Sequence, residues 1–225
     1  IGYAARHGKQ LAVLFFDLDR FKSINDTLGH PVGDDLLKVV ADRITRSLRQ
    51  SDLVARFGGD EFLIALPDVE RDHDAARVAQ KLGDLLARPC ELSGREYRVS
   101  VSIGIALFPR DGTDSDVLIR NADTAMYHAK AEPGRGYSYY AEGMNDLVAE
   151  RLDLEHGLRE AFDLQRFVLH YQPQVDTQSG ELVGAEALLR WQDPLRGLIP
   201  PNVFIPMAEE TGMVTAIGRW VLARA

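Results

Sequence analysis

The apolar positions in the first 140 residues predict strands and helices in alternation. A continuous apolar run at residues 11–16 is typical of a central strand covered on both faces. After Pro31 the apolar positions recur with a helical period. The expected elements are strand 11–16, helices 20–27 and 31–48, strands 53–55 and 62–66, a helix ending before residue 89, strand 97–108, helix 115–130 and strand 137–140. The order β-α-β-β-α-β predicts an α/β (α+β) fold with a ferredoxin-like, polymerase-palm type of central sheet that contains antiparallel strands.

The pattern changes after residue 140. Residues 141–163 form one amphipathic, charged stretch, which predicts a helix that connects two domains. Strands at 167–175 and 182–191 flank a turn, and a helical segment follows at 204–225. We therefore expect a domain at 1–140, a linker helix at 141–163 and an incomplete second domain at 164–225. A first residue other than Met also predicts a piece of a longer protein.

The charge, the apolar runs and the single cysteine exclude several classes of function. A net charge of −8 argues against binding to a nucleic acid polymer or an anionic membrane, because both require a basic surface. No apolar run approaches the ~20 residues that a membrane span needs. Cys90 is the single cysteine, so no intrachain disulfide can form and a reducing, cytoplasmic location is expected.

Two acidic positions stand out against the predicted strands. Gly58 and Gly59 separate two apolar runs and predict a hairpin turn, followed at once by Asp60 and Glu61. Asp17 directly follows the buried first strand. If these strands are neighbours, Asp17 and Asp60 can share one divalent ion, and magnesium commonly takes one or two carboxylates. The alternative is an ordinary exposed hairpin and a carboxylate that caps a strand or helix.

Several separated motifs resemble one family. The segments FDLDRFKSIND at 16–26, Gly29-His30, Gly33-Asp34 and RFGGDEF at 56–62 resemble the GGDEF family of diguanylate cyclases, over about residues 1–140. The resemblance implies that two GTP molecules condense into cyclic di-GMP and release pyrophosphate. It also implies a homodimer that carries one GTP on each subunit.

The resemblance assigns roles to individual residues. A magnesium ion, with manganese as an alternative, would be held by Asp17, Asp60 and the backbone carbonyl of Leu18. Lys22 would neutralise phosphate charge, and Asp60 or Glu61 would take a proton from the attacking ribose 3′-hydroxyl. The GTP-binding residues would be Asn25, His30, Asp34, Gly59, Lys130 and Arg135. Arg135 is one residue further along than is usual in the family, and Gly136 replaces the Asn that often follows it.

A second short motif suggests regulation. Arg49 and Asp52 match the RxxD inhibitory site of the family, at its usual spacing before Gly58. The resemblance implies that they bind cyclic di-GMP and cause feedback inhibition. Without the resemblance, Arg49 and Asp52 would be interpreted as an ordinary charge pair at the end of a surface helix.

The second part of the chain resembles the EAL family of cyclic di-GMP phosphodiesterases. Tyr171-Gln172-Pro173 and the segment EALLRW at 186–191 look like its first two barrel strands. In that family Glu186 would bind metal and Arg190 a substrate phosphate, beside Gln172. A complete barrel of this kind needs about 250 residues, so phosphodiesterase activity is not expected here.

Three functions therefore remain open. The first is a magnesium-dependent diguanylate cyclase. The second is a non-catalytic GTP-binding module that regulates an attached EAL phosphodiesterase. The third is a plain interaction domain whose hairpin is structural. We also expect the piece to be a poorer enzyme than its parent, or to associate through its unfinished barrel, because unpaired strands expose apolar surface.

Overall fold

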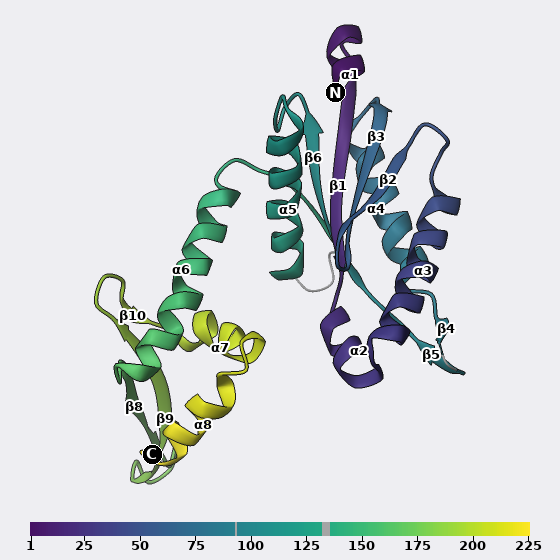
Figure 1. The fold of residues 1–225 in the computed structure, drawn as a ribbon. Coiled ribbons are helices and arrows are strands. Elements are labelled where there is room, and N and C mark those ends of the chain that lie inside the picture. The colour runs from purple at the N-terminus through teal and green to yellow at the C-terminus, as the bar shows by residue number, and fades with distance from the viewer. Residues whose placement is uncertain (93, 132–135) are drawn as a thin grey trace. The chain divides into compact units, whose positions relative to one another are not determined.

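The computed structural model describes residues 1–92, 94–131 and 136–225 (Figure 1). The chain divides into two compact units, Ile1–Val148 and Ala149–Ala225. Within the described residues, no helix is long and apolar enough to cross a membrane.

A five-stranded sheet forms the centre of the first unit. Its strand order is β2-β3-β1-β6-β7, and every neighbouring pair is antiparallel except β6 and β7. The elements of this unit are α1 (Gly2–His7), β1 (Gln10–Leu18), α2 (Phe21–Leu28), α3 (His30–Ser47), β2 (Leu53–Gly58), β3 (Glu61–Val69), α4 (Asp72–Leu86), β4 (Cys90–Leu92), β5 (Arg95–Tyr97), β6 (Val101–Phe108), α5 (Ser115–Ala131), β7 (Tyr137–Tyr139) and the start of α6 (Met144–Asp163). The mixed α/β fold with a central sheet confirms the predicted fold class.

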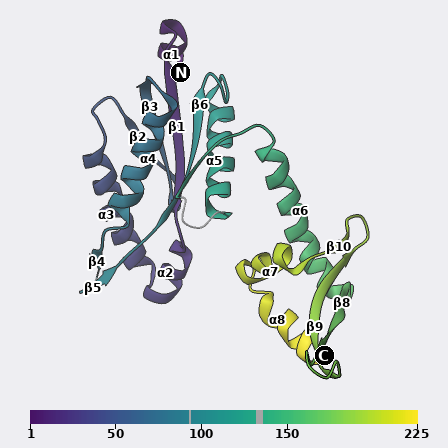
Figure 2. The same cartoon turned by 180° about the vertical axis from the view of Figure 1, so that it is seen from behind.

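Strand β1 is buried on both faces, as its apolar run predicts. Leu14 and Phe16 point into the core shared with α3 and α4, whereas Val13 and Phe15 point into the core shared with α5. This alternation follows from the two-residue period of a strand. Figures 1 and 2 show α5 on one side of the sheet and α3 and α4 on the other.

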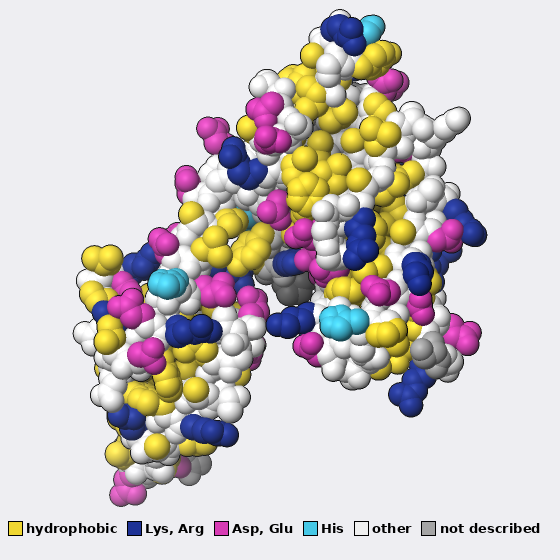
Figure 3. Space-filling model, viewed as in Figure 1, with side chains coloured by type: hydrophobic (Ala, Val, Ile, Leu, Met, Phe, Trp, Pro, Cys, Tyr) yellow, Lys and Arg dark blue, Asp and Glu magenta, His cyan; other side chains and the backbone are white. Residues whose placement is uncertain are grey.

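Helix α5 covers only part of its sheet face. Beside it, Leu53 and Phe57 of β2 are 68% and 59% exposed. Figure 3 shows the apolar side chains gathered over these strands. The ring of Phe57 packs edge-on against Phe15, with 5.3 Å between the centroids.

Helices α3 and α4 cap each other with cations. The Arg43 guanidinium of α3 donates hydrogen bonds to the carbonyls of Arg88 and Pro89, both at 2.6 Å, just beyond α4. The Lys81 ammonium of α4 donates to the Ser47 carbonyl, at 2.6 Å, in the last turn of α3. Each cation satisfies carbonyls near a helix end and opposes the negative end of its dipole.

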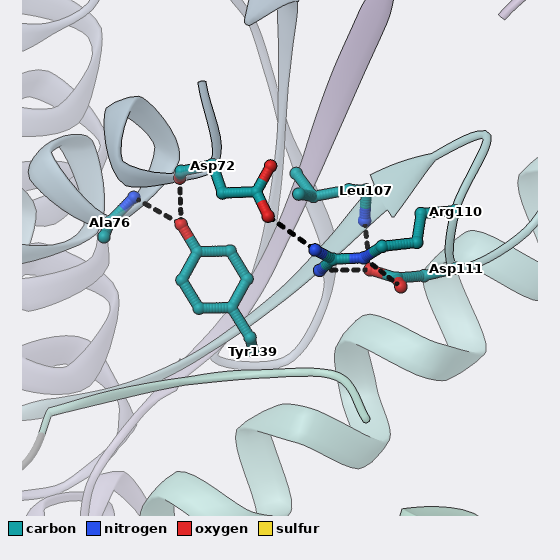
Figure 4. Close-up of polar contacts among 6 residues, drawn as sticks. All are labelled: Asp72, Ala76, Leu107, Arg110, Asp111 and Tyr139. Atoms are coloured by element: carbon teal, nitrogen blue, oxygen red, sulfur yellow. Dashed lines mark hydrogen bonds and ion pairs between the residues drawn. The ribbon is translucent and has the colours of Figure 1, made fainter. Parts of the chain in front are cut away.

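A polar network ties the start of α4 to strands β6 and β7 (Figure 4). The Tyr139 hydroxyl donates to the Asp72 carbonyl and accepts from the Ala76 amide at 3.0 Å. Arg110 pairs with the carboxylates of Asp72 and Asp111, at 2.5 and 2.8 Å. The network therefore fixes α4 against the sheet.

The second unit holds a smaller antiparallel sheet. Its strands are β8 (Phe167–Val175), β9 (Leu182–Asp193) and β10 (Gly197–Ile199), in the order β10-β9-β8. The helices that follow are α7 (Pro201–Glu210) and α8 (Val214–Leu222). Phe167, Trp191 and Phe204 lie at the centre of its core. The described residues form no closed barrel.

Two predicted elements are wrong. The strand expected at 97–108 is two strands, because β5 pairs with β4 whereas β6 pairs with β1. Alternation continues through Val99, so the apolar pattern does not show the change of partner. The helix expected at 204–225 is likewise two helices, separated at Gly212, which has φ of +74°.

The hairpin turn also differs from the prediction by one residue. Gly58 pairs with Glu61, so the two turn residues are Gly59 and Asp60 rather than Gly58 and Gly59. Only Gly59 has a positive φ, +49°. An irregularity between Arg56 and Gly58 takes up the extra residue, which is the usual effect of a β-bulge.

Candidate functional site

The predicted acidic residues meet at one end of the sheet. Strands β1 and β3 are antiparallel neighbours, with Phe16 opposite Phe62. Asp17 follows Phe16 and Glu61 precedes Phe62, so both acidic residues come to the same edge, beside Asp60 on the turn. The condition that the sequence left open, that these strands are neighbours, is met.

Asp17 is the most enclosed member of this group. Its side chain is 14% exposed, and Oδ2 accepts a hydrogen bond from the Lys130 ammonium of α5. Oδ1 is buried and has no hydrogen-bond partner among the described residues. Burial raises the pKa of Asp17, opposed by Lys130 and reinforced by the charges of Asp60 and Asp19. A cationic partner for Oδ1 would therefore be strongly favoured.

Glu61 lies in the same electrostatic environment. Its pKa is raised first by burial, and then by the negative charges of Asp123, Asp60 and Asp17. Asp123 is a residue that sequence reasoning missed. Asp123 lies seven positions before Lys130 on α5, and this spacing places both residues on one face of the helix. The spacing was therefore the signal in the sequence that could have pointed to Asp123.

Helix α5 reaches the site because β6 carries no side chain at Gly104. A Cβ there would lie 1.8 Å from the Ala122 carbonyl oxygen and 2.2 Å from the Met126 amide nitrogen. The helix backbone therefore contacts the strand directly. This close approach positions Asp123 and Lys130 beside the carboxylates of β1 and β3.

These residues fit a hard divalent cation. Asp17, Asp60 and the carbonyl of Leu18 offer only oxygen ligands, which magnesium prefers. The unpartnered Oδ1 of Asp17 is a free ligand atom. In the described part of the chain, no three His, Cys, Asp or Glu side chains are grouped as a metal site by themselves. A set of two carboxylates and one carbonyl is compatible with that finding, because magnesium usually keeps several waters.

A second group of predicted residues lies on α2 and α3. Asn25 of α2 is partly exposed, but its Oδ1 is buried and has no partner among the described residues. Lys22, His30 and Asp34 are exposed on the same two helices. The structure thus groups three polar residues and one cation on the two helices that follow Asp17.

The turn itself is open to a ligand. No atom lies within 4 Å of the position that a Cβ would take on Gly59. The Arg56 side chain donates from Nε to the Gly59 carbonyl at 2.8 Å and holds the turn. Arg135, the last of the predicted GTP-binding residues, lies outside the described residues.

Arg49 and Asp52 form a closed turn after α3. The Arg49 amide donates to the Asp52 carboxylate at 2.8 Å, and the Asp52 amide donates to the Arg49 carbonyl at 3.0 Å. Both residues line a cavity of about 300 Å³, which Asp74 and Arg77 of α4 also line. The predicted inhibitory pair therefore borders a cavity with a second arginine.

In the second unit, Gln172 of β8 lies directly opposite Glu186 of β9. Both residues are exposed. Arg190 donates from Nη1 to the Leu189 carbonyl at 2.8 Å. The strand pairing thus brings two of the three predicted EAL residues together.

Comparisons with known proteins agree with these features. The family described as "Diguanylate cyclase, GGDEF domain" matches residues 1–135, and the EAL domain family matches residues 155–225. The GGDEF domain of TpbB (YfiN) from Pseudomonas aeruginosa has 43% sequence identity and a TM-score of 0.63, over 66% of this chain and 87% of that one.

Some longer relatives are named for both activities, diguanylate cyclase and cyclic di-GMP phosphodiesterase, and others for one of them. The bifunctional diguanylate cyclase/cyclic di-GMP phosphodiesterase MucR of Pseudomonas aeruginosa is 47% identical over 100% of this chain and 33% of its own length. The cyclic di-GMP phosphodiesterase NbdA of the same organism is 42% identical over 97% of this chain and 28% of its own. The chain thus spans about a third of the relatives it matches. It belongs to the GGDEF family of diguanylate cyclase domains, with part of an EAL domain after it.

Proposed function

We propose that the first unit is a diguanylate cyclase, which joins two GTP molecules into cyclic di-GMP and releases two pyrophosphates. The observation that carries the proposal is the enclosed Asp17 carboxylate beside Asp60, Glu61 and Lys130. Acidic residues that burial and like charges perturb in this way are typical of functional sites.

The chain's own residues supply binding and proton transfer in this proposal. Asp17, Asp60 and the Leu18 carbonyl would hold Mg²⁺ or Mn²⁺, which when bound supplies charge neutralisation at the phosphates. Each ribose 3′-oxygen forms a bond to the α-phosphorus of the other GTP as the bond to pyrophosphate breaks. Asp60 or Glu61 accepts the hydroxyl proton. Lys22, Lys130 and Arg135 hold the phosphates.

Nucleotide recognition would fall to α2 and α3. Asn25 and Asp34 offer an amide and a carboxylate to the base edge, with His30 beside them. Gly59 leaves the turn free of a side chain, so the nucleotide can approach the backbone.

The protein would act as a homodimer that holds one GTP on each subunit. The site would work in the cytoplasm, where GTP is available.

We further propose that cyclic di-GMP inhibits the reaction by binding at Arg49 and Asp52. The cavity beside them supports this, because Arg77 adds a second arginine that suits a phosphate or a guanine edge, and the carboxylates of the lining suit the donors of a guanine edge. The proposed domain bounds are 1–140, 141–163 and 164–225. Gln172, Glu186 and Arg190 would belong to a phosphodiesterase site that needs further strands.

A second candidate function is a non-catalytic module that binds GTP and regulates a phosphodiesterase. One observation favours it: NbdA, which matches 97% of this chain, is named for phosphodiesterase activity alone. The unaltered GGDEF sequence at 58–62 favours the cyclase instead.

An activity assay on Asp60→Ala separates these functions. We expect the unsubstituted chain to form cyclic di-GMP from GTP and magnesium, and Asp60→Ala to lower the rate at least about 100-fold. The circular dichroism spectrum should stay unchanged, because Asp60 is a turn residue. Asp42→Ala, an exposed change on α3 away from the site, is the matched control and should keep the rate. GTP binding without turnover would support the regulatory module. No magnesium-dependent binding would leave only a structural hairpin.

A further inference from the structure

Helices α2 and α3 come close together at a position where α3 has no side chain. Gly33, in the first turns of α3, is buried and faces Asn25 of α2. A Cβ on Gly33 would lie 1.9 Å from Oδ1 and 3.0 Å from Cγ of Asn25. It would also lie 3.2 Å from Cζ of the Phe21 ring, so a methyl group has no free space on that side. Only glycine leaves room for the Asn25 side chain in this position.

This contact fixes which way the Asn25 amide faces. Oδ1 is enclosed against Gly33, with no hydrogen-bond partner among the described residues, although Asn25 as a residue is partly exposed. The amide nitrogen is then the polar atom that can meet a ligand, and it is a donor only. Asp34, next to Gly33, offers an acceptor carboxylate on the same helix. The pair presents one donor and one acceptor.

One donor and one acceptor together distinguish the two purines. Guanine offers an acceptor at O6 and donors at N1 and N2, which match an amide NH₂ and a carboxylate. Adenine has a donor amino group at position 6, where it would face the Asn25 amide donor. An unmatched polar pair of this kind weakens binding strongly.

We propose that Gly33 is a positioning residue for base selection: by enclosing Oδ1 of Asn25, it holds the amide NH₂ outward and makes the site prefer guanine to adenine. The inference rests on the proposed GTP-binding function. It adds a residue that acts through Asn25 and does not itself contact the base.

Gly33→Ala should disturb the amide more than the fold. The atom that a new Cβ would overlap is the far end of a flexible side chain, which can rotate away. Gly33 itself has no positive φ, and alanine is favoured over glycine within a helix. The Asn25 amide would therefore lose its fixed orientation while the helices keep their packing.

The test compares binding of α,β-methylene GTP and α,β-methylene ATP, which cannot release pyrophosphate, to the full chain with magnesium by calorimetry. The unsubstituted chain should prefer the guanine nucleotide, and Gly33→Ala should reduce that preference about tenfold, which corresponds to one hydrogen bond. Gly83→Ala is the matched control, because no atom lies within 4 Å of a Cβ at this α4 position. It should keep the full preference.

A double-mutant cycle tests whether Gly33→Ala changes the guanine preference through Asn25. In an Asn25→Ala background, Gly33→Ala should change the preference no further, because the atom it displaces is gone. An undiminished effect in that background would overturn the inference, as would a Gly33→Ala chain that keeps its preference or fails to fold. Absence of any guanine preference in the unsubstituted chain would overturn the proposed function, and this inference with it.

Discussion

Asp193, at the end of β9, shows how a single carboxylate holds a turn. Its side chain is buried, and Oδ1 accepts hydrogen bonds from the amides of Leu195 and Arg196 at 2.9 and 2.8 Å. The Arg196 amide bond is the main reason that the pKa of Asp193 is lowered from its ordinary value of 3.8. Such a group stabilises the fold in its ionised form, because the folded state binds its proton less readily than the unfolded state.

The stabilisation by Asp193 should therefore depend on pH. It is fully present above 3.8 and is lost as pH falls through the lower pKa of the folded state. We expect Asp193→Asn to cost the second unit about 1 kcal/mol at about pH 7, because a neutral acceptor makes weaker bonds. Urea unfolding followed by tryptophan fluorescence would measure this. The difference between the two chains should shrink on acidification, and a constant difference would contradict the assignment.

At the same scale, the sequence predicts the members of the acidic site better than their contacts. Asp17 and Asp60 stand out because carboxylates at strand ends are recognisable in a pattern. The pairing of Lys130 with Asp17 cannot be recognised in the pattern, because it joins α5 to β1 across more than 100 positions of the sequence. The fit of Asn25 against Gly33 is equally invisible, because it depends on the spacing of two helix backbones.

At the scale of elements, the position of α5 depends on one residue of β6. Gly104→Ala would place a Cβ within 2.9 Å of three backbone atoms of α5. Backbone atoms cannot rotate aside as a side chain does, so the helix as a whole must move. We expect a loss of at least about 3 kcal/mol in the first unit, measured by denaturant unfolding with circular dichroism. Gly83→Ala, in open space on α4, should instead add about 0.5–1 kcal/mol. Equal stabilities for the two variants would show that α5 adjusts freely.

Element prediction fails where the hydrogen-bonding partner changes but the apolar pattern does not. Tyr97, Val99 and Val101 alternate without a break, so they read as one strand. Strand β1 ends at Leu18, opposite Val101, and the Asp19 amide still donates to the Ser100 carbonyl at 3.0 Å, but Tyr97 pairs with Cys90 of β4 instead. Which strand pairs with which is decided by the whole sheet and cannot be read from the apolar pattern of one strand. For the same reason the composition of a turn, two glycines, indicates a hairpin but leaves its register uncertain by one residue.

At the scale of the whole molecule, the two units have separate cores. Leu14 lies in the main core of the first unit and is fully buried, whereas Phe204 lies in the core of the second and is also fully buried. The ring of Phe204 lies 6.0 Å from Trp191 and 5.6 Å from Phe167. Both tryptophans of the chain, Trp191 and Trp220, belong to the second unit. Tryptophan fluorescence therefore reports on that unit alone.

Separate cores predict separate unfolding transitions. Phe204→Ala should cost the second unit about 3–5 kcal/mol, a large part of the stability of a small domain, and should shift or abolish the tryptophan transition. Leu14→Ala should cost the first unit about 2–5 kcal/mol and shift only the circular dichroism transition. The decisive comparison is the tryptophan transition of Leu14→Ala. If it moves together with the circular dichroism signal, the units unfold as one, and a cyclase site on the first could not be studied independently of the second. If it stays in place, changes in nucleotide binding made by substitutions in the first unit can be assigned to that unit.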